Sequence, residues 1–174
     1  MIMQITTKYM IFILFISLSL TRYASADDDL VRLANLPSTP VSQLQNLALN
    51  TDWKVRQAIA MNRRTPVATL TRLAHDPEMV VRIAVATNLS CSEKIHFILA
   101  KDKQIQVRSV IARFEYVSAK VLELLARDKS VDIRIEAARN WNTDIHTLKK
   151  LAKDNFEEVR QMAMRSLEKR AMEK

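Results

Sequence analysis

Cysteine and histidine are the side chains in this sequence that could support nucleophilic or metal chemistry. Cys91 is the sole cysteine, and the histidines are His75, His96 and His146. His96 follows Cys91 by five residues, a spacing that does not by itself pair a nucleophile with a base. The histidines lack the spacing of a zinc site such as His-x3-His. We therefore predict no catalytic residue, no metal and no cofactor, and we interpret Cys91 as structural.

Glycine is absent from the sequence. Phosphate-binding loops and nucleophile elbows need glycine, because they require positive φ angles or a close approach of the backbone. This absence argues against a nucleotide-binding enzyme or an α/β-hydrolase. Turns must then be built from asparagine, serine and proline, which favours short helices joined by tight connections.

A repeat of 26 residues runs through the chain. The pair Leu-Ala recurs at this interval, from Leu47-Ala48 to Leu151-Ala152. An asparagine or aspartate follows each of these leucines by three residues. A Val-Arg or Ile-Arg pair has the same interval, and its arginines are Arg56, Arg82, Arg108, Arg134 and Arg160. A fixed period of this length is typical of stacked repeat units.

Each unit is predicted to form two short helices. The first would begin after the asparagine or aspartate, whose side chain can cap a helix, and Val55 and Ile59 would lie on its apolar side. Asn62 would close this helix in a left-handed conformation, and Thr65-Pro66 would begin the second helix. One unit cannot bury its apolar side alone, so the units must stack. The predicted fold is an all-α solenoid of about five two-helix repeats.

The repeat also predicts the domain organisation. Residues 27–174 are expected to form a single helical-repeat domain. Within it, 27–50 would be an N-terminal cap, 51–150 the core repeats and 151–174 a C-terminal capping helix, since terminal units of solenoids differ from the middle.

The repeat pattern resembles the leucine-rich-repeat-variant family, a relative of the HEAT-like helical repeats. The resemblance rests on Leu73-Ala74-His75-Asp76-Pro77, on Val81-Arg82 and on Asn88, and it extends over about residues 38–166. It implies α-helices alternating with short or 3₁₀ helices in a right-handed superhelix, and a scaffold or binding role. The iron–sulfur cysteine cluster of some members does not transfer, because there is a single cysteine. Phe114 and Val117-Ser118 depart from the pattern and leave that turn in doubt.

The five repeated arginines are predicted to form a structural ladder along one edge. Asp52 stands four residues before Arg56, and Glu78 stands four residues before Arg82. This is the favourable order for an ion pair within a helix, and the capping aspartates could also reach the arginines. Binding of an anion or a partner by the same arginines is the alternative.

The loops after the first helices are predicted to align on one rim of the solenoid. Aromatic and arginine side chains are enriched at the centres of protein interfaces. The alternative is that the aromatic side chains pack back onto neighbouring units. The candidate partner-binding residues are Arg63, Arg64, Leu89, Phe114, Tyr116 and Trp141.

Residues 1–26 have the layout of a secretory signal peptide. Lys8 precedes an apolar run over 10–20, and Ala24-Ser25-Ala26 ends the segment. The run is shorter than the roughly 20 residues that span a bilayer. We expect cleavage after Ala26 and a periplasmic or secreted protein without a stable membrane span. An uncleaved anchor is the alternative, which Arg22 keeps open.

The formal net charge of the chain is +8. The repeats, the absent catalytic set and the signal peptide predict an exported, non-catalytic scaffold for a protein partner, and the basic charge makes an acidic partner one of the options. An inhibitor or immunity-type protein would act in this way. The alternative is a module that binds a polyanion, either nucleic acid or an anionic envelope polymer, although export argues against nucleic acid. The sequence does not determine the oligomeric state.

Overall fold

The computed structural model describes residues 27–172. The predicted signal peptide, 1–26, lies outside the described residues. No helix in the described part is long and apolar enough to cross a membrane.

The described chain is helical throughout and contains no strand. After a helical segment at 27–35, longer helices alternate with helices of seven residues. The longer helices are α3 (Trp53–Met61), α5 (Met79–Ala86), α7 (Ile105–Arg113), α9 (Val131–Arg139) and α11 (Glu157–Met172). The short helices are α2 (Val41–Leu47), α4 (Val67–Leu73), α6 (Glu93–Leu99), α8 (Ala119–Leu125) and α10 (Ile145–Leu151).

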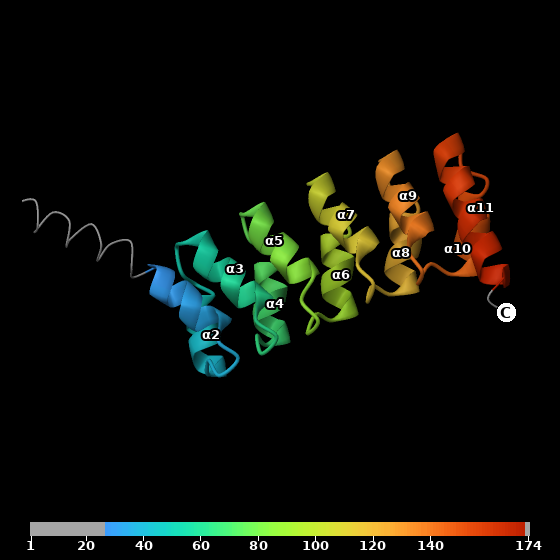
Figure 1. The fold of residues 1–174 in the computed structure, drawn as a ribbon. Helices are drawn as coiled ribbons and strands as arrows, with labels where there is room; N and C mark the ends of the chain where they lie inside the picture. Colours follow the sequence, from blue (N-terminus) through green and yellow to red (C-terminus); the bar gives the residue numbers. More distant parts are fainter. Residues whose placement is uncertain (1–26, 173–174) are drawn as a thin grey trace, which may run out of the picture.

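The units stand side by side in chain order, so that the molecule is an elongated α-solenoid (Figure 1). Each longer helix contacts the longer helix of the next unit, from α3 through α11. The longer helices therefore form one layer and the short helices the other. This arrangement confirms the predicted all-α solenoid.

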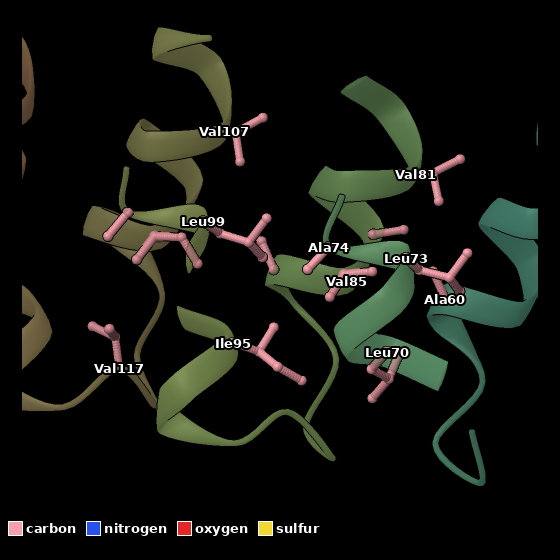
Figure 2. Packing of buried hydrophobic residues seen from close by; sticks show 14 of the residues in the cluster. Ala60, Leu70, Leu73, Ala74, Val81, Val85, Ile95, Leu99, Val107 and Val117 are labelled. Carbon is pink, nitrogen blue, oxygen red and sulfur yellow. The ribbon is translucent and has the colours of Figure 1, made fainter. Parts of the chain in front are cut away.

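The repeated apolar residues form the core between the two layers. Leu73 and Val81 are 2% and 0% exposed, and Leu99 and Val107, one unit later, are both 0% exposed. Figure 2 shows these two pairs in corresponding positions of consecutive units. Because each apolar face is covered by the next unit, stability accumulates from one unit to the next.

The second helix of each unit is a short α-helix. In α4 the backbone N–H of Ala74 donates to the carbonyl of Leu70, which is the i to i−4 pattern of an α-helix. The tighter i to i−3 pattern, from Asp76 to Leu73, occurs in the turn that follows. Of the two forms that the family resemblance implies, this chain has the short α-helix.

The prediction of a left-handed asparagine at the end of the first helix was wrong. Asn62 has φ −71° and ψ 123°, and Asn140 has φ −63° and ψ 131°, so both are extended. No residue in 27–172 has positive φ. The extended backbone frees the side-chain amide for bonds to the preceding unit, which explains why asparagine recurs here.

Candidate partner-binding rim and the ladders that position it

Arginine–aspartate pairs join consecutive units along one edge. Nε of Arg82 donates to Oδ2 of Asp102 at 2.6 Å, and Nη2 donates to Oδ1 at 3.1 Å. Nη1 donates to the backbone carbonyl of Asp76 at 2.7 Å. The same pairing links Arg56 to Asp76, Arg108 to Asp128 and Arg134 to Asp154.

This geometry corrects the expected ion pair within the helix. Arg56 pairs with Asp76 of the next unit, and Asp52 instead caps α3 by accepting from the N–H of Lys54. The aspartate of the next unit presents both carboxylate oxygens to the guanidinium, and a bidentate pair is stronger than a single contact. Arg160, in the last unit, donates to the backbone carbonyls of Asp154 and Asn155.

The rungs are buried and internally neutral. The side chains of Arg82 and Asp102 are 6% and 8% exposed. Burial by itself would raise the pKa of Asp102, but hydrogen bonds from Arg82 and from the N–H of Gln104 outweigh it, and the pKa is lowered. Arg134 lowers the pKa of Asp154 in the same way, chiefly by its hydrogen bond. The ladder therefore contributes fixed geometry and little free charge.

Asparagines form a second ladder on the opposite edge. Nδ2 of Asn88 donates to the carbonyls of Ala60 and Asn62 in the preceding unit, at 2.6 and 3.0 Å. Its Oδ1 accepts from the N–H of Ser90 at 2.7 Å. Asn62 and Asn140 make equivalent contacts. Our sequence reasoning missed this role, although the repeat of asparagine at 26 residues was its signal.

In several units a threonine beside the asparagine ladder closes the rim loop. Oγ1 of Thr65 donates to the carbonyl of Ile59 at 2.6 Å. Cys91 takes this position in the next unit, with Sγ 3.0 Å from the carbonyl of Val85. Burial raises the pKa of Cys91 to about 12, so it stays a thiol at neutral pH. Cys91 therefore serves to close its loop through the contact with the Val85 carbonyl, which is a structural role.

The asparagine ladder positions the loops that carry the candidate rim residues. Arg63 and Arg64 are exposed, and Leu89, Tyr116 and Trp141 are 46%, 64% and 57% exposed. Arg64 donates to the carbonyl of Pro37 one unit earlier, at 3.0 Å. These side chains all belong to one rim, but they are distributed over several units.

Tyr116 and Trp141 lie on the same open groove, which has a volume of about 500 Å³. Loop residues and the ends of α7 and α9 line it together. Arg139 pairs with Glu136 at 3.0 Å, whereas Arg113 makes no ion pair within residues 27–172. The complete lining is Arg113, Glu115, Tyr116, Glu136, Arg139, Asn140, Trp141 and Asn142. We call it the rim groove.

The family model described as "Leucine rich repeat variant" matches residues 53–78, one full period of the repeat, and the same period continues through the solenoid. Residues 53–78 therefore match the repeat unit of the leucine-rich repeat variant family.

A solved structure has the same fold. It is described as "a leucine-rich repeat variant with a novel repetitive protein structural motif", and it aligns with a TM-score of 0.62 at 24% sequence identity. The match covers 78% of this chain and 54% of the solved chain, so this chain spans about half the length of that structure. No curated protein matches the sequence.

The third unit departs from the repeat-variant pattern, and the structure shows how. Phe114 replaces the asparagine but keeps its extended backbone, with φ −67° and ψ 126°. Its half-buried ring meets His96 and Tyr116 edge-on, with centroids 5.5 and 5.6 Å apart. Phe114 thus packs onto its neighbours, and the turn whose geometry was in doubt retains the standard shape.

His96 lies under this irregular unit. His96 is only 5% exposed, and its Nε2 atom has no hydrogen-bond partner among the described residues. Burial lowers the pKa of His96, and a hydrogen bond with the Ala86 backbone opposes part of that effect. In the regular units, the ladder asparagine donates to the carbonyl of an alanine in the preceding unit, and Ala86 is that alanine for the third unit. Because Phe114 replaces the asparagine there, the hydrogen bond between His96 and Ala86 partly replaces the missing contact.

The C-terminal helix α11 contacts the end of the rim. Arg170 donates to the carbonyl oxygens of Asn140, Trp141 and Thr143, and its guanidinium lies 5.1 Å from the centre of the Trp141 ring. Nζ of Lys169 lies 5.7 Å from the same ring. The helix thereby fixes the position of Trp141 while 57% of the residue stays exposed.

The described residues hold no cluster of three or more histidine, cysteine or carboxylate side chains suited to a metal ion. His75 and His146 are exposed, in different units from His96.

Proposed function

We propose that this chain is an exported, non-catalytic scaffold that binds a protein partner at the rim groove. The observation that carries the proposal is the exposure of Tyr116 and Trp141 on one groove beside Arg113 and Arg139. Tryptophan, tyrosine and arginine are the residues that most often dominate binding energy in protein interfaces.

The groove is also held in place before a partner arrives. Asn142 donates to the carbonyls of Glu115 and Val117 across the unit boundary, at 2.5 and 3.0 Å. Asn140 ties its loop to the preceding unit, and Arg170 ties the same loop to α11. A preordered surface loses less conformational entropy on binding, so more of the contact energy appears as affinity.

A binding role also agrees with the repeat architecture, whose units offer a long surface of regularly placed loops. The proposed export rests on the sequence of residues 1–26, and sequencing of the mature N-terminus tests it. A mature chain starting at Met1 would refute cleavage after Ala26. In that compartment, an inhibitor or immunity-type protein would use such a rim to hold its target.

The partner can be sought by quantitative affinity capture from the envelope fraction of the source cells. The decisive variant is Tyr116→Ala with Trp141→Ala, and the matched control is Leu49→Ala with Trp53→Ala, which removes exposed apolar side chains outside the groove. Circular dichroism must show that both variants keep their helix content. A protein retained by the control and lost by the groove variant supports the proposal, whereas equal retention by both refutes the rim groove.

Binding of a polyanion is the second candidate function. The observation that favours it is the set of exposed lysines on the short helices, which includes Lys94 of α6, Lys120 of α8 and Lys149 of α10. If the chain binds polyanions, its affinity should fall steeply as the salt concentration rises and should differ little among anionic ligands.

A further inference from the structure

Two adjoining grooves follow the arginine–aspartate ladder, on the edge opposite to the rim. Their volumes are about 380 and 420 Å³, and they share Lys101, Asp102 and Lys103. The first reaches back to the rung of Arg82, and the second continues to that of Arg108. We call this continuous surface the ladder trough.

The free charge of the ladder trough is positive. Lys101, Lys103 and Lys129 are exposed and make no ion pair within residues 27–172. The carboxylates beside them, Asp102 and Asp128, are held by Arg82 and Arg108 at 2.6 Å. Since each buried rung is neutral, the exposed lysines determine the sign of the field that a ligand meets.

Apolar side chains lie between the lysines. Ile98 lines the first groove and Leu124 the second, and both are half-buried. They occupy the same position of consecutive units, as do Lys103 and Lys129. Each unit of the trough therefore presents one apolar side chain together with one or two unpaired lysines, and this combination recurs every 26 residues.

We propose that the ladder trough binds an extended acidic segment of a protein, with carboxylates at the lysines and apolar side chains on Ile98 and Leu124. Polyphosphates and acidic polysaccharides have no apolar side chains to cover these two residues. The lining contains no phenylalanine, tyrosine or tryptophan on which nucleic-acid bases could stack. A peptide that combines carboxylates with apolar side chains matches both features.

This inference extends the proposed protein binding to a second surface and gives that surface its own ligand chemistry. The trough lies on the loops that precede the longer helices, whereas the rim groove lies on the loops that follow them. Variants in one surface therefore leave the side chains of the other in place, and the two proposals can fail separately.

Fluorescence anisotropy with a labelled peptide of alternating glutamate and leucine tests the trough. The variant Lys101→Ala/Lys103→Ala/Lys129→Ala is compared with Lys94→Ala/Lys120→Ala/Lys149→Ala, which removes the same charge from exposed lysines outside the trough. We expect the trough variant to lose about tenfold or more in affinity, because contacts between a ligand and nearby charges weaken with each removed partner. The control variant should lose no more than about threefold, from the changed net charge alone.

Two reference ligands distinguish the chemistry. An all-glutamate peptide of the same length should bind more weakly than the alternating peptide, and an oligonucleotide of the same charge should show no preference for the trough. Equal losses in the two triple variants, or equal binding of all three ligands, would overturn the proposal in favour of general polyanion binding. Absence of peptide binding to the unaltered protein would also overturn it, whereas loss of binding in the Tyr116→Ala/Trp141→Ala variant would assign the peptide to the rim groove instead.

Discussion

Nε of Arg108 lies 2.6 Å from Oδ2 of Asp128, which belongs to the next unit. Replacement of Arg108 by methionine should lower the free energy of unfolding by about 3 to 5 kcal/mol, because it leaves a buried carboxylate without its partner. Urea denaturation followed by circular dichroism measures the change. If the variant were as stable as the original chain but lost partner binding, the arginine ladder would be a binding surface and not a structural element.

Arg127 provides the matched control for that experiment. It pairs with Glu123 at 2.9 Å, but its side chain is 69% exposed. Arg127→Met should therefore change stability by no more than about 1 kcal/mol, as is usual for surface ion pairs. A similar loss in both variants would show that burial is not what distinguishes the ladder.

The ladder aspartates should make the fold sensitive to acid. The pKa values of Asp102, Asp128 and Asp154 are lowered in the folded chain, so the unfolded chain binds more protons as the pH falls. Their stabilisation is complete above the unfolded pKa of about 3.9 and is lost as the pH falls through the folded values. Asp128→Asn should be less stable at neutral pH and lose less on acidification. Urea titrations of the variant and of the original chain, at neutral and at acidic pH, test this prediction. If acidification lowered the stability of both proteins equally, the prediction would be contradicted.

Loss of one asparagine rung should be costly. Asn88→Ala removes the donor from the carbonyls of Ala60 and Asn62, and Asn88 is only 4% exposed. We expect a loss of about 2 kcal/mol or more, since buried acceptors without partners incur a desolvation penalty. Asn155→Ala, at an exposed asparagine, is the control and should be close to neutral. Thermal melts of both variants provide the comparison.

His96 should add a second pH dependence in a milder range. Burial lowers its pKa, so the folded chain favours the neutral imidazole. The associated stability is complete above the unfolded pKa of about 6.5 and declines as the pH falls toward the folded value. His96→Gln should remove this decline, and His75→Gln, at an exposed histidine, should leave it unchanged. Melting temperatures of the original chain and of both variants test this prediction. They are measured as the pH falls below the unfolded pKa of histidine but stays above the range in which the aspartates protonate.

The repeat predicted the architecture well, because stacking of units follows directly from periodic apolar residues that one unit cannot bury. It also placed Arg82 and Arg108 on one edge, since equal positions in a repeat lie at equal positions in the solenoid. The domain limits, the rim residues as binding residues and export stay predictions.

The choice of contact partner depended on the tertiary structure. From the sequence, Arg56 had carboxylates available at Asp52 and at Asp76, and only the spacing between stacked units brings Asp76 into a bidentate position. The asparagine was expected to serve its own helix end by a left-handed turn. Its amide instead reaches the backbone of the previous unit, a contact that local sequence rules do not contain.

The sequence by itself determined that units repeat, which side chains face the core and which loops share an edge, because these properties are set by spacing along the chain. The tertiary structure alone decided that Phe114 packs onto His96 while Trp141 stays exposed beside Arg170. It also decided that Arg113 and Glu136 of adjacent units line one groove. Such features depend on which atoms neighbouring units bring together, and a repeat period does not specify the side chains that fill a particular gap.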